Sequence, residues 1–266
     1  MFNSDEKERY ARHFILPEIG EAGQKKIKDA KVLVVGTGGL GSPVDFYLAA
    51  AGVGTLGIVD ADVVDASNLQ RQILHFTDDI GKEKTLSAKD KLKKLNPNVN
   101  VITYQQKALA QNVEELVANY DIIVDCTDNF PARFLLNDAA YFAGKPLVHG
   151  AIFRFDGSVT TIKPNEGPCY RCIYHQPPAP SKQSDPSLAG LIGSVPGIVG
   201  TIMATETLKL ITGVGRPLVG KLLSIDTLHM EFTKVNVRKD PKCPLCGTKS
   251  ITGLVDHEHA TNIDLV

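Results

Sequence analysis

Short apolar runs alternate with amphipathic segments through the first 151 residues of this sequence, and this alternation constrains the fold most. The clearest run is Val32–Val35, which stops at Gly36, as is typical of a strand buried on both faces. Similar runs predict strands over residues 55–59, 99–104, 122–124 and 146–151. The intervening segments predict helices over residues 40–51, 82–95, 113–118 and 131–142. We therefore expect an α/β protein with a doubly wound, Rossmann-like parallel sheet.

Beyond Gly150 the pattern changes. Phe155–Ser158 is typical of a hairpin turn, and it leads into a predicted strand over residues 159–163. A later helix and two later strands are expected around residues 199–212, 221–225 and 229–237. The sequence thus predicts one continuous sheet that is parallel in its N-terminal half and partly antiparallel in its C-terminal half.

Length and composition fit one globular unit. Of the 266 residues, 43% are hydrophobic, which is enough to fill a sizeable core. We expect a single domain over residues 1–250 and a polar tail over residues 251–266 that includes His257–His259. Residues 176–191 are rich in Pro, Ser and Gln, and they predict a mobile loop.

Charge and apolar patterning exclude several classes of partner. The 29 basic and 30 acidic residues give a net charge of −1, so no basic excess favours nucleic acid or a membrane surface. Met1–Arg12 is too polar for the core of a signal peptide. Val195–Ala204 falls short of the roughly 20 residues that cross a bilayer. We expect a cytoplasmic protein.

A glycine-rich loop lies between the first predicted strand and the following helix, and it fits the pattern G-x-G-x-x-G. Its glycines are Gly36, Gly38, Gly39 and Gly41. Such a loop lets the backbone approach phosphate, and the helix N-terminus adds free N–H groups. Asp60 ends the next strand 19 residues after Gly41, close to the spacing of a ribose-binding acid. The loop predicts nucleotide binding, with NAD as the default nucleotide and an empty tight turn as the alternative.

The segment after Asp60 favours a triphosphate over NAD. It contains a run of polar residues, namely Asp62, Asp65, Ser67, Asn68, Gln70, Arg71, Lys82 and Lys84. Cations and amides beside the glycine loop can neutralise a triphosphate, whereas a dinucleotide is held mainly through its pyrophosphate at the loop itself. Any one of these residues alone would be interpreted as a solvated surface charge.

A second polar group, Asp125–Asn129, follows the predicted strand over residues 122–124. Ligands bind at the carboxyl ends of strands in such sheets, so Asp125 and Asp128 are expected to face the phosphates. An acid beside phosphates serves chiefly as a Mg²⁺ ligand. The alternative is an N-cap ahead of Pro131, a role that either Asp128 or Asn129 can fill.

Four of the five cysteines form two Cys-x-x-Cys pairs. They are Cys169 with Cys172, and Cys243 with Cys246. In a chain without an export signal this pattern indicates metal rather than disulfides, and four thiolates favour tetrahedral, structural Zn²⁺. Because 71 positions separate the two pairs, the metal would tie the end of the chain to its middle.

Taken together, these motifs resemble those of the MoeB/ThiF/HesA family, the bacterial relatives of ubiquitin-activating enzymes, and MoeB in particular. The matching segments are Arg9–Arg12, Gly36–Gly41, Asp60–Asp62, Ser67–Gln72, Gly81–Lys84, Asp125–Asn129, Gly150–Ala151 and both cysteine pairs. They run in the family's order over nearly the whole chain.

The resemblance implies ATP-dependent adenylation of the C-terminal Gly-Gly carboxylate of a small ubiquitin-like sulfur carrier. It assigns ribose binding to Asp60, phosphate contacts to Asn68, Arg71 and Lys84, and Mg²⁺ binding to Asp128. Asp62 and Asn129 belong to the same motifs and are expected at the nucleotide site. Arg12 matches an arginine that such homodimers insert into the partner's nucleotide site. The carrier would be of the molybdopterin-synthase or thiamine type.

One departure from the family concerns cysteine. Many relatives carry a cysteine between the first Cys pair and the last helix, but residues 173–242 contain none, and Pro186 and Ser187 lie near its place. Cys126 is expected to be a small core residue. The reaction would therefore stop at the acyl-adenylate, with sulfur supplied by a separate cysteine desulfurase or rhodanese.

Two other classes of function remain open from the sequence. An NAD-dependent oxidoreductase explains the glycine loop and Asp60, but it leaves Arg71, Asp128 and the cysteine pairs without a role. A non-catalytic half of a heterodimeric activating enzyme would tend to lose Arg71, Lys84 or Asp128, and all three are present.

Overall fold

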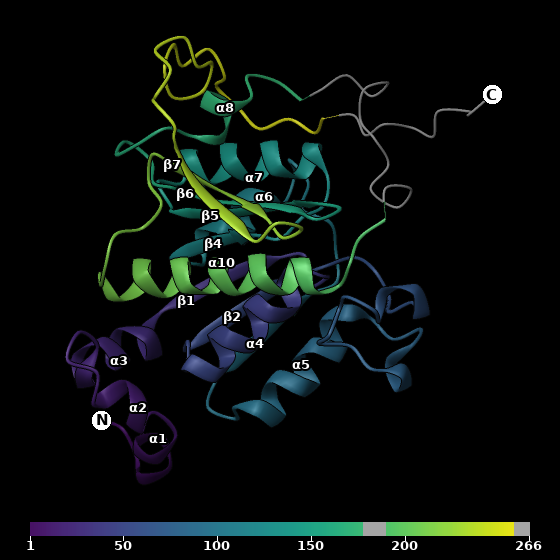
Figure 1. Ribbon diagram of the computed structural model, residues 1–266, viewed down its shortest axis with the longest axis vertical. Helices are drawn as coiled ribbons and strands as arrows, with labels where there is room; N and C mark the ends of the chain where they lie inside the picture. Colours follow the sequence, from purple (N-terminus) through teal and green to yellow (C-terminus); the bar gives the residue numbers. More distant parts are fainter. Residues whose placement is uncertain (178–189, 258–266) are drawn as a thin grey trace.

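The computed structural model describes residues 1–177 and 190–257, and one mixed sheet runs through this part of the chain (Figure 1). The strands lie side by side in the order β3-β2-β1-β4-β5-β6-β7-β8. Their bounds are β1 Lys31–Val35, β2 Thr55–Val59, β3 Asn100–Tyr104, β4 Ile122–Asp125, β5 Leu147–Phe153, β6 Asp156–Ile162, β7 Lys221–Asp226 and β8 Glu231–Asn236.

Strand direction divides the sheet into two halves. Strands β3, β2, β1, β4 and β5 are parallel, and β5 to β8 pair antiparallel. The predicted parallel half and partly antiparallel half are therefore confirmed. The parallel strands β1, β2 and β4 are buried almost throughout, whereas β8 is exposed along its whole length.

Helices cover both faces of the sheet. Their bounds are α1 Ser4–Arg9, α2 Ala11–Phe14, α3 Gly20–Asp29, α4 Gly41–Ala51, α5 Lys84–Leu95, α6 Val113–Ala118, α7 Phe130–Phe142, α8 Tyr170–Ile173 and α10 Ser194–Thr212. Short 3₁₀ turns occupy Ala66–Asn68 and Thr77–Asp79. Figure 1 shows α4 and α10 on one side of the sheet and α6 and α7 on the other.

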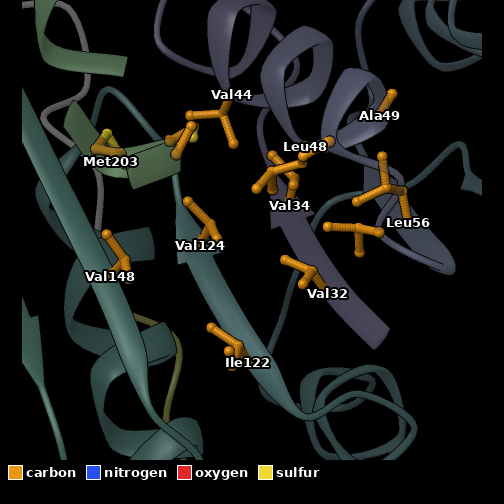
Figure 2. Close-up of a cluster of buried hydrophobic side chains, with 14 of the residues drawn as sticks. Val32, Val34, Val44, Leu48, Ala49, Leu56, Ile122, Val124, Val148 and Met203 are labelled. Carbon is orange, nitrogen blue, oxygen red and sulfur yellow. The ribbon is translucent and has the colours of Figure 1, made fainter. Parts of the chain in front are cut away.

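Alternate residues of β1 enter two different cores, as strand geometry requires. Val32 and Val34 pack with α4 and α10, in the cluster that includes Leu48 and Met203 (Figure 2). Leu33 and Val35 join the second cluster, beneath α6 and α7. Burial on both faces explains why the sequence of this strand is a continuous apolar run.

The structure differs from the sequence expectations at several places, among them the short helix α8, which was not predicted. The N-terminal helices α1 to α3 were not predicted, because α1 is charged and is held by a capping box in which Asn3 and Glu6 bond each other's backbone N–H. Helix α10 begins at Ser194, five residues before the expected start. The β5–β6 turn is Arg154–Phe155, since Phe153 already pairs with Asp156.

The predicted mobile loop and the polar tail fall mostly outside the described residues, and Pro186, Ser187, Glu258 and His259 lie there too. Before the tail leaves the described part, Ile251 and Leu254 pack on the second core. His257 is not a free end, because its ring packs against Phe134. Within the described residues, none of the helices is both long and apolar enough to span a membrane.

Candidate nucleotide site and four-cysteine centre

The glycine loop joins β1 to α4 at the carboxyl edge of the parallel strands. Gly36 has φ +91°, and a Cβ there would lie 2.8 Å from the carbonyl oxygen of Cys126. A Cβ on Gly41 would lie 2.0 Å from the carbonyl oxygen of Gly36. The fold itself requires both glycines, because they let the helix and the loop after β4 approach the backbone of Gly36.

The two central glycines leave space instead. A Cβ on Gly38 would lie 3.5 Å from Gln72 Nε2, and one on Gly39 would lie 3.4 Å from Pro196 Cβ and 3.7 Å from Arg71 Cγ, all ordinary contacts. Packing therefore does not forbid a side chain at either position. Bare backbone here fits a cradle for a phosphate, with Arg71 lying directly beside it.

Asp60 holds the glycine loop from the end of β2. Its Oδ2 accepts a hydrogen bond from Thr37 N at 2.9 Å, and its Oδ1 accepts one from Asp62 N at 2.9 Å. Burial raises the pKa of Asp60, although nearby Lys84 opposes the shift. The predicted acid thus lies at the loop, at the position that a ribose-binding carboxylate occupies in this fold class.

The polar segment after Asp60 supplies cations at the same edge. Lys84 is buried, and its Nζ lies 2.9 Å from Asp62 Oδ2, so its ammonium group is fixed at the first turn of α5. Arg71 Nη1 donates a hydrogen bond to the carbonyl oxygen of Ser67 at 3.0 Å, and this bond orients the guanidinium group. Asn68 lies in a 3₁₀ turn capped by Asp65. Arg71 and Asn68 are half-buried and available to a ligand.

The loop after β4 corrects one expectation. Asp125 does not face the nucleotide edge: it is fully buried, and its oxygens accept from His149 Nδ1 at 2.8 Å and from Thr127 N at 3.0 Å. Burial would raise the pKa of Asp125, but the hydrogen bond from His149 holds that pKa below its ordinary value. Asp128, the residue directly after Thr127, is exposed and remains the candidate metal ligand.

Asn129 has a structural role. It is the N-cap of α7, and its side chain accepts from Ala132 N at 3.0 Å. Its Nδ2 also lies 3.3 Å from Asp128 Oδ1. The sequence alternative of an N-cap ahead of Pro131 is therefore confirmed for Asn129. Asp128 does not cap this helix.

Arg12 lies apart from these residues. It is exposed on α2, and Figure 1 shows α1 to α3 at one end of the molecule, far from the segment between β2 and α5. The structure does not bring Arg12 to the glycine loop of its own chain.

Sequence reasoning missed three side chains at this edge. Gln72 is buried over Gly38, and its Oε1 has no hydrogen-bond partner among the described residues. Arg133 is buried beside the carbonyl of Thr127, and its Nε is likewise unpartnered within the described part. His149 lies outside the motifs quoted above, and its Nδ1 bonds Asp125. The spacing of Arg133, four residues after the cap Asn129 on one face of α7, is a signal that could have indicated it.

The four paired cysteines form one cluster. The four Sγ atoms all lie within 4.8 Å of one another. The Sγ atoms of Cys169 and Cys243 are 3.5 Å apart, and those of Cys172 and Cys246 are 3.3 Å apart. Four thiolates at about 2.3 Å from a tetrahedral Zn²⁺ would lie roughly 3.8 Å apart, so the set fits that ion. Three of the cysteines are buried, and the fourth, Cys172, is half-buried. A closed four-sulfur set leaves no open ligand position.

Comparisons with known proteins agree with this geometry. Residues 10–245 match the model of the ThiF family. The chain belongs to the ThiF family. It is 47% identical over 263 residues to the sulfur carrier protein adenylyltransferase of Thermus thermophilus, covering 97% of each chain. It is also 46% identical to the SAMP-activating enzyme E1 of Haloferax volcanii, covering 95% of this chain and 93% of the relative.

Other similar proteins are longer. The probable adenylyltransferase/sulfurtransferase MoeZ of Mycobacterium tuberculosis is 46% identical, with 96% of this chain covering 64% of that protein. Among solved structures, E. coli MccB with ATP superposes with a TM-score of 0.79 at 25% identity, covering 90% of this chain and 74% of MccB. The resemblance that the motifs indicated is therefore confirmed.

Proposed function

We propose that this ThiF-family chain is an adenylyltransferase that uses ATP to activate the C-terminal Gly-Gly carboxylate of a small ubiquitin-like sulfur carrier, releasing pyrophosphate. The observation that carries the proposal is the bare backbone at Gly38 and Gly39 beside Arg71, at two positions where packing would admit a Cβ. It is supported by full-length similarity to a relative named as a sulfur carrier protein adenylyltransferase.

The chemistry follows from charge. The carboxylate attacks the α-phosphate, so an anionic nucleophile meets an anionic electrophile, and catalysis consists of holding the two together and neutralising charge. In this proposal Arg71, Asn68 and Lys84 contact the phosphates, and Asp60 holds the ribose. A Mg²⁺ ion at Asp128 would bind phosphate oxygens and offset their charge. The Asp62 contact fixes Lys84 before the substrate arrives.

The four cysteines are assigned to structural Zn²⁺. The ion would join the segment around α8 to the turn at Cys243–Cys246 and would take no part in the reaction. The product is the acyl-adenylate of the carrier. Sulfur then comes from a separate cysteine desulfurase or rhodanese, in molybdenum cofactor or thiamine biosynthesis.

The test of this function is ATP–pyrophosphate exchange that depends on the carrier. Purified enzyme should exchange labelled pyrophosphate into ATP only when a carrier ending in Gly-Gly is present, and a carrier lacking its last glycine is the matched control. Titration with NAD should give no binding. Exchange without the carrier, or tight binding of nicotinamide, would favour the oxidoreductase or another activity.

We further propose a homodimer in which Arg12 of one subunit completes the nucleotide site of the other. Arg12→Ala and Asp128→Ala should each be inactive alone. When the two variants are mixed and exchange subunits at random, some dimers contain one subunit of each variant. Each such dimer has an intact Asp128 and an intact Arg12 together at one of its two sites. The mixture should therefore show about a quarter of wild-type exchange. Mixtures that stay inactive, at concentrations where size measurements show exchanged dimers, would place Arg12 outside the site.

A further inference from the structure

Helix α4 carries a carboxyl group directly behind the glycine loop. Asp45 is completely buried, one turn into the helix that begins at Gly41. Its Oδ2 accepts a hydrogen bond from Thr37 Oγ1 at 2.6 Å. Its Oδ1 has no hydrogen-bond partner among the described residues. A buried carboxylate that is only half satisfied is costly, so the arrangement favours the neutral acid.

Thr37 connects Asp45 to the rest of the nucleotide edge. Besides the hydroxyl bond to Asp45, its N–H donates to Asp60 at 2.9 Å, and its carbonyl lies 3.0 Å from Nε2 of His75. All three polar groups of this residue are therefore fixed from different elements. Thr37 thus ties the glycine loop to three other segments, and Asp45 holds its side chain.

The ionisable groups around Asp45 add no positive charge next to it. Burial raises the pKa of Asp45 to about 8, the Thr37 hydroxyl lowers it, and Asp60 raises it further. Cys126 faces Asp45 from the loop after β4, and burial raises the pKa of that thiol well above its usual value. Burial lowers the pKa of His75 to about 4, so that ring is neutral.

Three lysines on the helices packed on α4 are already paired with acids. On α10, Lys209 pairs with Glu206 of the same helix. On α5, the first-turn Lys84 pairs with Asp62 and the later Lys91 pairs with Asp79. Each of these lysines is thus already engaged by an acid.

We propose that Asp45 is a positioning residue of the nucleotide loop that acts as a neutral acid, fixing Thr37 while keeping negative charge away from the bound triphosphate. The inference rests on the proposed use of ATP. Ionised Asp45 would place a negative charge behind the loop, in a poorly solvated site, and would repel the phosphates. Asn is nearly the same shape and cannot ionise, so Asp45→Asn should imitate the working form.

The experiment measures kcat/KM for ATP in carrier-dependent exchange from pH 6 to pH 9. Wild type should lose about tenfold between pH 7.5 and pH 9 through a rise in KM for ATP. Asp45→Asn should stay within about threefold of wild type at pH 7 and should show no alkaline loss. Thr37→Val removes the hydroxyl that lowers the pKa of Asp45, so its alkaline loss should move to higher pH. An Asp45→Asn profile that keeps the wild-type alkaline loss would overturn the proposal.

Thermal unfolding tests Asp45 without using activity. Between pH 4 and pH 8 the unfolded chain has lost the Asp45 proton and the folded chain keeps it, so stability falls as pH rises through that window. Asp45→Asn removes this loss, and its Tm should exceed that of wild type by a margin that grows from pH 5 to pH 8. A Tm difference between Asp45→Asn and wild type that stays constant from pH 5 to pH 8 contradicts the proposal. If wild type shows no exchange but the margin grows, the proposed function fails while Asp45 is still a buried neutral acid.

Discussion

The nucleotide edge and the four-cysteine centre are built in opposite ways. At the edge, half-buried Asp60 and buried Lys84 are fixed by hydrogen bonds to the loop and to Asp62, whereas exposed Asp128 and half-buried Arg71 remain available to a ligand. At the centre, four sulfurs lie within 4.8 Å of one another, and three of the four cysteines are buried. A site with free side chains can bind a substrate and act on it, whereas a metal site whose ligand positions are all filled can only stabilise the fold. The comparison teaches that activity and stability should separate cleanly between the two regions.

The largest separation between an effect on activity and an effect on stability is expected at two neighbouring residues, Asp128 and Asn129. Asp128→Ala should lower carrier-dependent exchange by about 10³-fold with little change in Tm, because Asp128 is exposed and caps no helix. Asn129→Ala removes the cap of α7 and should cost about 1 kcal/mol of unfolding free energy. Exchange assays and urea melts on both variants check the pair. An Asp128→Ala variant that keeps exchange would remove Asp128 from the site.

At the cysteine centre the expected effect is on folding. Cys243→Ser should release the bound metal and lower the unfolding free energy by about 3 kcal/mol or more, since the fully buried sulfur joins two distant segments. Metal analysis and thermal melts measure both changes, and a strong chelator should reproduce them in wild type. A metal-free variant with an unchanged Tm would contradict a structural metal.

The two regions meet at Tyr170, and its contact with His149 sharpens the comparison. Tyr170 lies between Cys169 and Cys172 in the sequence, and its ring centroid is 4.8 Å from that of His149, which bonds the buried Asp125 at the end of β4. Tyr170→Leu should therefore lower stability by about 2 kcal/mol and exchange by several-fold. Tyr170→Phe keeps the ring and serves as the control. A loss of exchange at Tyr170→Leu equal to that of Asp128→Ala would show that the regions are not separable.

The smallest effect is expected at the fifth cysteine. Cys126 is buried, and burial raises the pKa of its thiol well above the ordinary value, which keeps it protonated and unreactive. Cys126→Ala should leave exchange within about twofold and cost about 1 kcal/mol of stability. Enzyme incubated with carrier and ATP should form no adduct that DTT cleaves. Mass spectrometry that finds the carrier on Cys126 would contradict this.

Local patterns predicted much of the molecule. The glycine loop, Asp60 and the positions of most strands along the chain could be inferred because each depends on a few adjacent residues, such as the apolar run Val32–Val35 closed by Gly36. The cysteine centre was predictable despite the 71 positions between its pairs, because Cys-x-x-Cys spacing is itself a ligand pattern.

Pairings between elements were not predictable. Asp125 has the position of a metal ligand in the sequence, but the register of β4 against β5 places His149 beside it and turns it inward. The bond between Thr37 and Asp45 likewise depends on how α4 packs behind the loop. A single sequence carries the residue types of such pairs and not the distances that join them.

The most direct test of the central claim is a crystal structure with a non-hydrolysable ATP analogue, Mg²⁺ and a peptide ending in Gly-Gly. The account predicts phosphates on the backbone amides of Gly38 and Gly39, the ribose on Asp60, and the metal and the peptide carboxylate next to Asp128. A nucleotide bound elsewhere, or a peptide tail remote from the α-phosphate, would contradict it.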